Sequence, residues 1–324
     1  MSVPADVIAA LGNATSAIFS SHVPPDGDGL GAAIALVRWF RSTGRRAVFA
    51  AGGDVQSCLH FVYEEDEIDT APAGPEESFD LHVALDAATR ARLAGNEPRF
   101  AAAPLLVNVD HHVTNENFGH VNWVDPDASS TGEMVYRLLK EIGAPLSTEI
   151  AEPLYVAVMT DTGRFSYSNT TPAVHGMAAE LLAAGVRPDR ATGAIYRSVS
   201  PSWLRLTALA VEGMTIVADG RVACITATTQ IIERSGADPL DVGDLVSIPI
   251  SVAGVEVGAL FRPADGGGTK ISLRSREVFP VNEFAARYGG GGHPRAAGAK
   301  VDLPVEEARD AVLAELAAAV AEAG

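Results

Sequence analysis

Three apolar runs of this chain each end in aspartate or histidine residues, and this feature limits the folds that the chain can adopt. The runs, with the residues that end them, are SAIFSSH at 16–22, FDLHVALD at 79–86 and APLLVNVDHH at 103–112. Helical patterns lie at 28–42 and 129–142, and a further short strand is predicted within 44–53. Strands that alternate with helices form a parallel sheet, and ligands bind beyond the carboxyl ends of its strands. The chain is therefore predicted to be α/β, with acidic and histidine residues at the ligand-binding edge of a parallel sheet.

The pattern changes after residue 185, which indicates a second domain. A chain of 324 residues exceeds one average core, so two domains are expected. Residues 185–210 interrupt the alternation with prolines, serines and arginines. A hairpin with its turn at Asp219-Gly220, a second strand pair around ADGGGT, a helix, a strand and a final helix from Pro304 are predicted after them. We expect a parallel-sheet domain at 1–190, a linker at 191–212 and a smaller mixed α+β domain at 213–324.

Composition excludes several classes of protein. The net charge is −17, and a protein that binds long nucleic acid normally presents a basic stripe instead. We expect no membrane span, because no stretch reaches about 18 uninterrupted apolar residues. The first residues lack the basic and apolar segments of a signal peptide, and Cys58 and Cys224 are too isolated to indicate a disulfide framework or a cysteine zinc site. A cytoplasmic location is therefore expected.

The residues that indicate chemistry are carboxylates and imidazoles near the predicted strand ends. They are His22, Asp26, Asp28, Asp86, Asp110, His111, His112 and Asp161. A lone Asp-Gly-Asp is more often a surface turn or helix cap, and a lone aspartate after a strand is often a cap too. Three strand ends that bring such residues to one edge of one sheet are harder to explain in this way. Asp161 follows an apolar helical run, and because an acid is disfavoured at a helix C-terminus, a compensating cation is expected there.

Five ordered segments resemble the motifs of a known family. HVPPDGDGLG, the strand end at Asp86, VDHH and TDTGRF are similar to the four motifs of the DHH superfamily of phosphoesterases. RYGGGGHPRAAG at 287–298 resembles the glycine-rich histidine motif of the associated DHHA1 domain. Length and domain order are most similar to the bacterial group that hydrolyses very short RNA and 3′-phosphoadenosine 5′-phosphate (pAp), whose actinobacterial branch also hydrolyses cyclic di-AMP. Gly29 and Ala32 depart from the first motif, but neither stands at a ligand position.

The resemblance implies a two-metal site. One metal ion would be held by His22, Asp26 and Asp86, and the other by Asp28, Asp86, His111 and Asp161. Mixed oxygen and imidazole ligands suit Mn²⁺ better than Mg²⁺, so two Mn²⁺ ions are expected, with Mg²⁺ or Co²⁺ as substitutes. Asp110 would fix an imidazole tautomer, and His112 would face the scissile phosphate as a catalytic residue.

The second domain is expected to bind the substrate. Consecutive backbone N–H groups of Gly290, Gly291 and Gly292 could form an anion nest that ends at His293. By resemblance, His293 contacts the phosphate being cut, and Arg274 with Ser275 holds the nucleotide. Further cations nearby in the sequence are Arg262, Arg276 and Arg295. The alternative for these arginines is a solvated strand face.

Several functions are compatible with this pattern. The favoured one is hydrolysis of short oligoribonucleotides such as pApA, of pAp and, as a further candidate, of cyclic di-AMP, by a homodimer that binds no long nucleic acid and no membrane. A manganese pyrophosphatase shares the first-domain motifs, but GGGGHPRAAG stands where a loop rich in lysine and arginine would be expected. Short length and acidic charge oppose a processive exonuclease. A non-catalytic cyclic-dinucleotide sensor predicts loss of a metal ligand, and all the expected ligands are present.

Overall fold

The computed structural model describes residues 2–69, 78–96, 99–100, 104–197 and 200–323. The chain divides into two compact units, Met1–Ser198 and Val199–Gly324. Each unit contains one six-stranded sheet of its own. The predicted fold class, an α/β domain followed by a smaller mixed domain, is confirmed.

The first unit is built on a parallel sheet with the strand order β3-β2-β1-β4-β5-β6. Its strands are β1 (Ser16–Ser20), β2 (Arg46–Ala50), β3 (Ile68–Asp69), β4 (Leu81–Leu85), β5 (Leu106–Asp110) and β6 (Val121–Val124). All neighbouring pairs are parallel. Every residue of β4 and β5 is buried, which explains why these strands are continuous apolar runs rather than alternating ones.

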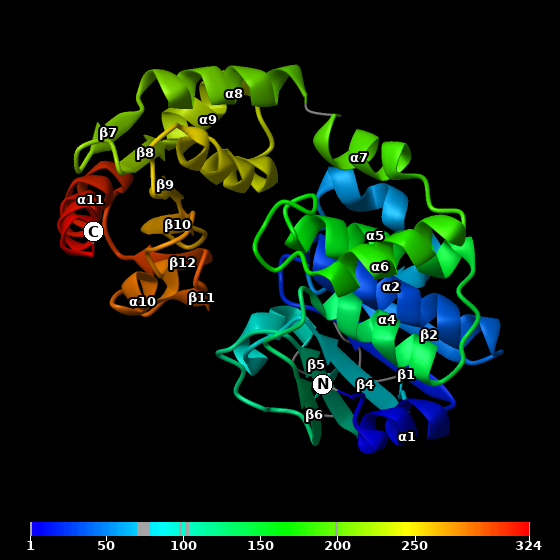
Figure 1. Ribbon diagram of the computed structural model, residues 1–324. Helices are drawn as coiled ribbons and strands as arrows, with labels where there is room; N and C mark the ends of the chain where they lie inside the picture. Colours follow the sequence, from blue (N-terminus) through cyan, green and yellow to red (C-terminus); the bar gives the residue numbers. More distant parts are fainter. Residues whose placement is uncertain (1, 70–77, 97–98, 101–103, 198–199, 324) are drawn as a thin grey trace. The chain divides into compact units, whose positions relative to one another are not determined.

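Helices of the first unit pack on this sheet and on one another. They are α1 (Ala5–Asn13), α2 (Gly27–Ser42), α4 (Thr131–Glu141), α5 (Thr148–Asp161), α6 (Pro172–Ala183) and α7 (Pro188–Tyr196), with 3₁₀ turns at Ser57–Val62, Glu65–Glu67 and Arg90–Asn96. Figure 1 shows α2, α4, α5 and α6 layered together against the strands. Gly31 of α2 allows α5 to approach closely, because a Cβ there would lie 2.3 Å from the carbonyl oxygen of Pro153. The two helices that carry Asp28 and Asp161 are thus packed in direct contact.

The order of the strands explains where the functional residues gather. β1 pairs with β2 on one side and with β4 on the other, so the direction of winding reverses between β1 and β4. Such a reversal opens a crevice beyond the carboxyl ends of the two strands. The segment around His22 follows β1, and Asp86 is the first residue after β4. These two segments therefore meet at the switch point of the sheet.

The second unit contains a mixed sheet with the order β11-β12-β10-β9-β8-β7. Its strands are β7 (Thr215–Val217), β8 (Val222–Thr226), β9 (Val257–Pro263), β10 (Thr269–Ser275), β11 (Gly291–His293) and β12 (Ala296–Val301). Its helices are α8 (Pro201–Glu212), α9 (Thr229–Ser235), α10 (Val281–Ala286) and α11 (Val305–Glu322), with 3₁₀ turns at Pro239–Ser247 and Pro249–Ser251. The β8–β9 pair is parallel and the other pairs are antiparallel.

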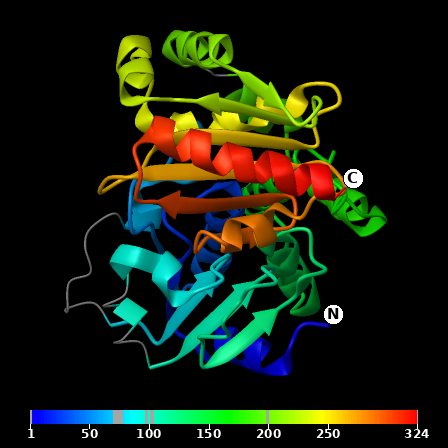
Figure 2. The ribbon, with the colours of Figure 1, turned by 90° about the vertical axis from the view of Figure 1, so that its left-hand side faces the viewer.

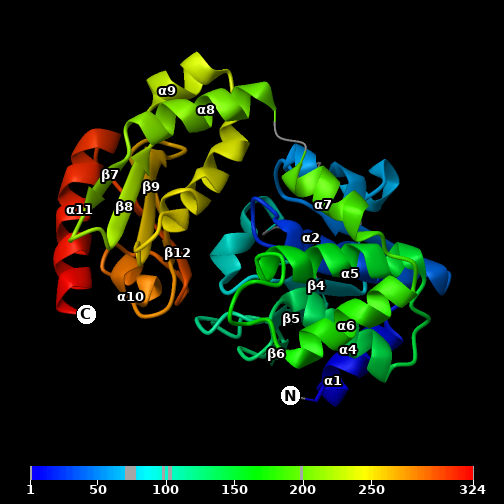
Figure 3. The same cartoon turned by 45° about the horizontal axis from the view of Figure 1, so that its top comes forward.

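The two faces of this sheet bury different clusters. In Figure 2, α11 lies across one face, where its apolar residues pack with Phe261, Ile271 and Leu273. Figure 3 shows α8 beside α9, and α8 packs with Ile225 and Leu260 in another cluster. Residues of β10 alternate between buried and more exposed positions, which agrees with the predicted strand pair around the glycine turn.

The predicted hairpin at 213–226 is confirmed, with Asp219 and Gly220 in left-handed conformations between β7 and β8. The predicted linker at 191–212 includes residues 198 and 199, which lie outside the described residues. Around them, this segment contains the end of α7 and all of α8. None of the helices described is both long and apolar enough to cross a lipid bilayer.

Candidate metal centre and active site

The first part of the site is the loop between β1 and α2. Asp26 is the N-cap of α2, and its Oδ1 accepts hydrogen bonds from the backbone N–H groups of Asp28 (2.9 Å) and Gly29 (3.1 Å). Its other oxygen, Oδ2, lies 3.3 Å from Nε2 of His22. One carboxylate thus caps the helix and faces an imidazole at the same time. Asp26 can therefore cap the helix and also act as a metal ligand, so the two interpretations of the Asp-Gly-Asp segment are compatible.

Asp86 lies at the centre of the site. It follows β4 with a left-handed φ of 54°, which turns the chain sharply at the strand end. Its Oδ2 lies 3.4 Å from Nε2 of His22, and its Oδ1 lies 3.6 Å from Nε2 of His111. Gly29 makes room for this arrangement, because a Cβ there would lie 2.6 Å from Cβ of Ser21 and 3.3 Å from Oδ2 of Asp86. This close approach gives a steric reason for the glycine that departs from the family motif.

Asp28 is oriented by the N-terminus of another helix. The backbone N–H groups of Thr131 and Gly132, in the first turn of α4, donate to its two carboxylate oxygens at 2.7 and 2.8 Å. A helix N-terminus attracts an anion, so these bonds fix the orientation of the buried carboxylate. His111 is close to this carboxylate, with its Nε2 3.7 Å from Oδ2 of Asp28, and the same nitrogen lies 3.5 Å from Oδ2 of Asp161. Asp161 is the last residue of α5, as expected.

These side chains form two overlapping groups that could hold a metal ion. His22, Asp26 and Asp86 form one, and Asp28, Asp86 and His111 form the other, with the donor atoms of each group within 4.8 Å of one another. Asp86 belongs to both groups. A third group consists of Asp86, Asp110 and His112. Carboxylate oxygens with imidazole nitrogens are a donor set that fits first-row divalent cations.

The raised pKa values of His22 and Asp28 also indicate that this cluster would bind cations. Burial alone would lower the pKa of His22, but Asp26 and Asp86 outweigh it and raise the pKa to about 10. Burial, together with the charges of Asp86 and Asp161, raises the pKa of Asp28 well above its usual value. Without a metal ion, the cluster thus holds protons on imidazoles and on a carboxylate in order to lower its negative charge. Divalent cations would supply that neutralisation and release the protons.

A hydrogen-bond network supports His112, and the sequence predicted only its first member, Asp110. Nδ1 of His112 is 2.7 Å from Oδ1 of Asp110. Oδ2 of Asp110 accepts from the side-chain amide of Asn115 at 2.6 Å, and this amide also donates to Oδ1 of Asn108 at 2.9 Å. Asn108, in β5, donates in turn to the carbonyl oxygens of Ala84 and Ala87. An asparagine three residues after the histidine pair was the only signal in the sequence.

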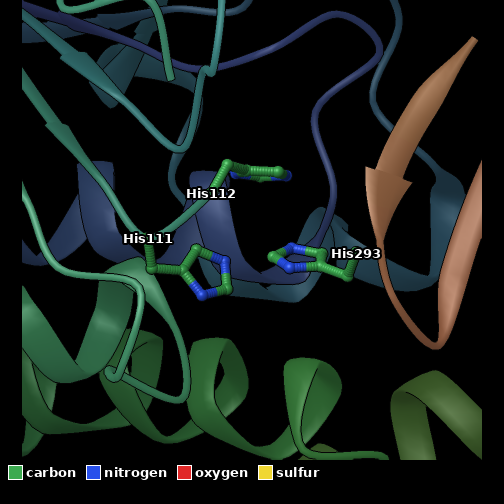
Figure 4. Close-up of side chains that lie close together, drawn as sticks. All are labelled: His111, His112 and His293. Atoms are coloured by element: carbon green, nitrogen blue, oxygen red, sulfur yellow. The ribbon is translucent and has the colours of Figure 1, made fainter. Parts of the chain in front are cut away.

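The two histidines of this segment have distinct surroundings. Figure 4 shows both imidazoles leaving the chain beyond the end of β5, and their ring centroids are 5.1 Å apart at an angle of 70°. His111 is buried among the carboxylates of the two metal-compatible groups. His112 is more exposed and is held by Asp110. The two imidazoles therefore have different partners, carboxylates of both metal-compatible groups for His111 and Asp110 for His112.

The glycine run of the second unit is shaped mainly by packing between strands. A Cβ on Gly290 would lie 2.1 Å from the carbonyl oxygen of Gly298, and a Cβ on Gly292 would lie 2.5 Å from that of Ala296. The N–H group of Gly290 donates to the carbonyl of Ala285, so it is not directed at a ligand. Gly291 is exposed, and a Cβ built on it would have no atom of the described part of the chain within 4 Å. His293, the other imidazole in Figure 4, is the last residue of β11.

The arginines that were predicted near this run differ in their contacts. Arg276 donates to the carbonyls of Ile250 and Val252, and Arg295 donates to those of Phe279 and Glu277. Both therefore brace loops within the unit. The remaining predicted residues are Arg262 on β9 and Arg274 and Ser275 on β10. Burial lowers the pKa of Arg262, whose Nε has no hydrogen-bond partner among the residues that the structure describes.

Comparisons with known proteins agree with this geometry. The DHH family N-terminal domain matches residues 17–158, and the DHHA1 domain matches residues 222–322. The bifunctional oligoribonuclease and PAP phosphatase NrnA of Thermus thermophilus is 34% identical over 300 residues, which are 91% of this chain and 87% of that protein. The protein of the same name from Bacillus subtilis is 30% identical over 305 residues, 92% of this chain and 93% of that protein.

A solved structure is similar over nearly the whole chain. It is the crystal structure of an exopolyphosphatase-related protein from Bacteroides fragilis, with a TM-score of 0.89 and 28% identity, and the match covers 98% of this chain and 96% of that one. The resemblance expected from five short motifs is thereby confirmed. Motif order, both domain matches and whole-length likeness to the NrnA proteins lead to one assignment, and the chain belongs to the DHH/DHHA1 family of phosphoesterases as an NrnA-like member.

Proposed function

We propose that this enzyme is a manganese-dependent phosphoesterase that uses two metal ions to hydrolyse short oligoribonucleotides and pAp. The observation that carries the proposal is the position of Asp86. One of its oxygens faces His22 and the other faces His111, so a single carboxylate borders both metal-compatible groups. A carboxylate in this position can bridge two cations, and paired cations are a recurring device in phosphoester hydrolysis.

The proposed ligands are those that the family resemblance implies. His22, Asp26 and Asp86 would hold one ion, and Asp28, Asp86, His111 and Asp161 would hold the other. When bound, the two cations would neutralise the charge that develops on the phosphate oxygens. The N-terminal turn of α4 supports this role of Asp28, because hydrogen bonds to a ligand fix its orientation. Manganese is preferred for the mixed donor set, with Mg²⁺ or Co²⁺ as substitutes.

His112 and His293 are the imidazoles proposed to act on the scissile phosphate. Asp110 holds the Nδ1 side of the His112 ring, so His112 would accept or donate a proton at Nε2. We assign His293, from the second unit, the role of a hydrogen-bond donor to the phosphate being cut. Arg262, Arg274, Ser275 and the exposed Gly291 are the residues proposed to bind the rest of the nucleotide.

The proposed substrates are small. NrnA proteins of Thermus thermophilus and Bacillus subtilis, named for oligoribonuclease and PAP phosphatase activity, support pApA and pAp as substrates, and cyclic di-AMP is a further candidate. A net charge of −17 opposes long nucleic acid. We further propose that the enzyme acts in the cytoplasm as a homodimer.

A parallel assay tests the function. The purified protein is incubated with pAp, pApA, cyclic di-AMP and pyrophosphate at equal concentration, with Mn²⁺ and again after chelation, and the products are separated by chromatography. We expect hydrolysis of pAp and pApA that the chelator abolishes and added Mn²⁺ restores. Hydrolysis of pyrophosphate alone would instead identify a pyrophosphatase. Tight binding of cyclic di-AMP without hydrolysis of any of the four would identify a sensor.

A further inference from the structure

Tyr167 is an exposed aromatic residue six positions after Asp161 of the candidate metal centre, and it belongs to neither metal-compatible group. It lies in the loop that follows Asp161, the last residue of α5. Its side chain is 58% exposed. An aromatic ring that remains in solvent beside a binding site is a candidate for contact with a ligand.

The ring of Tyr167 lies face-on over Gly163. A Cβ built on Gly163 would be 2.3 Å from Cζ of Tyr167 and 2.5 and 2.6 Å from its two Cε atoms. Similar distances to three ring carbons place the ring face, rather than its edge, against the glycine. Because more than half of the side chain is exposed, the opposite face is directed toward solvent. One face of the Tyr167 ring thus packs on the backbone of Gly163, and the other face is open.

The loop that carries the ring is held in an unusual conformation. Three consecutive residues, Gly163, Arg164 and Phe165, have left-handed φ values of 55°, 63° and 62°. This region is unfavourable for residues other than glycine, so other contacts must maintain it. The Thr162 hydroxyl accepts from the N–H of Phe165, and the Thr162 carbonyl accepts from the N–H of Tyr167 at 3.0 Å. These bonds fix the backbone of Tyr167 to the end of α5.

The loop that carries the Tyr167 ring begins directly after Asp161, a residue of the candidate metal centre. Gly163 is two residues after Asp161, so their Cα atoms are at most about 8 Å apart. A nucleotide whose phosphate lies among the carboxylates could therefore place its base on the ring. Arg164 adds an exposed positive charge to this loop and lies over the ring of Tyr196 at 4.8 Å. In a chain of charge −17, this cation favours an anionic ligand.

We propose that Tyr167 is a stacking platform for the nucleobase of the substrate. It selects nucleotides over phosphate esters and polyphosphates that lack a base, since every base offers a π-face for stacking. The inference rests on the proposed function, because it names the part of that substrate which the loop after Asp161 binds.

The test compares a substrate with and without its base. Wild type, Tyr167→Ala and Tyr167→Phe are assayed on pAp and on ribose 3,5-bisphosphate, which carries the same phosphates and no adenine. Leu182→Ala, which removes an exposed apolar side chain of α6, is the matched control. We expect Tyr167→Ala to lower kcat/KM for pAp by about tenfold or more, mainly through KM. Tyr167→Phe should stay within about twofold of wild type, because the ring remains. Hydrolysis of the abasic compound should be the same in all four proteins.

Three results would overturn the inference while the proposed function stands. One is a Tyr167→Ala variant with wild-type kcat/KM on pAp. Another is an equal loss on both compounds, which would mean that the ring supports the backbone around Asp161 rather than the base. A wild-type enzyme that hydrolyses the abasic compound as well as pAp would also contradict base selection. Hydrolysis of neither compound would overturn the proposed function itself.

Discussion

Nδ1 of His112 lies 2.7 Å from Oδ1 of Asp110, and this contact begins a hydrogen-bond network that ends at strand β5 of the sheet. Asn115 holds the other oxygen of Asp110, and Asn108 of β5 accepts a hydrogen bond from Asn115. The imidazole is therefore oriented by a strand rather than by a mobile loop. Nδ1 of His112 also lies 3.6 Å from Oδ1 of Asp86. The hydrogen-bond network therefore orients an imidazole that is close to the carboxylate shared by both metal-compatible groups.

Asn115→Ala tests the importance of this hydrogen-bond network for activity. The substitution leaves one oxygen of the fully buried Asp110 without its amide donor, which should loosen the ring of His112. We expect kcat for pApA to fall by about 10- to 100-fold, with manganese content unchanged. Glu116→Ala, at the exposed neighbouring position, is the control and should retain full activity. Wild-type kcat in Asn115→Ala would show that Asp110 needs no such support.

His293→Ala tests the role of the second unit. Loss of one donor to the transition state should lower kcat by about 10²-fold or more, while the bound manganese should remain. Kinetics on pApA and metal analysis of the same preparation give both readouts. His60→Ala, at an exposed site of the first unit, should change neither. If His293→Ala instead loses manganese, His293 has been assigned the wrong role.

His82 makes stability depend on pH. The side chain is fully buried, its Nε2 is 3.1 Å from the Ser20 hydroxyl, and its ring stacks on Phe100 at 3.8 Å. Burial lowers the pKa of His82 to about 3, so between about pH 6.5 and 3 only the unfolded state protonates it. The stability that neutral His82 contributes is present above pH 6.5 and is lost as the pH falls.

The loss at His82 should amount to about 2 kcal/mol between pH 6.5 and 5. Removal of the titrating group in His82→Gln should flatten the pH dependence of unfolding by that amount relative to wild type. Urea unfolding at the two pH values measures the difference. Parallel curves for the two proteins would show that His82 is protonated in the folded state as well.

Substrate length is expected to matter because of charge. Each phosphate beyond the site meets an acidic protein, and two of the four arginines predicted to lie near the substrate, Arg276 and Arg295, already bond to carbonyls of their own unit. We predict a steep fall in kcat/KM between pApA and oligonucleotides longer than about five residues, and a smaller gap at higher salt. Kinetics on a length series at two salt concentrations will measure this. Equal cleavage of pApA and a 24-mer at low salt would favour the exonuclease alternative.

Much of the first unit could be predicted from the sequence because its signals are local. Apolar runs that end in aspartate identify β4 and β5, and their alternation with helices predicts a parallel sheet, although the order of its strands comes from the structure. The contribution of α4 to Asp28 was not predictable, since the two partners are 103 and 104 residues apart. Strand β6 was also missed, because only one of its four residues is buried and the pattern lacks a continuous apolar run.

In the second unit, glycines and arginines gave ambiguous signals. A glycine run can serve an anion or a neighbouring strand, and only the distances at Gly290 and Gly292 distinguish the two. Likewise, Arg276 and Arg295 resembled phosphate ligands in the sequence, while their guanidinium groups bond to backbone carbonyls. Tyr167 gave no signal at all, because its exposure depends on how the loop after α5 folds.

The most direct test of the account is the pApA hydrolysis rate of Asp86→Ala with saturating Mn²⁺. Asp302→Ala, which removes an exposed carboxylate of the second unit, serves as the control and should match wild type. Asp86 borders both metal-compatible groups, so its loss should disable both ions together. The account predicts turnover below about one per cent of wild type in Asp86→Ala, with the fold intact by circular dichroism. Turnover clearly above that level would contradict a carboxylate shared by two metal ions.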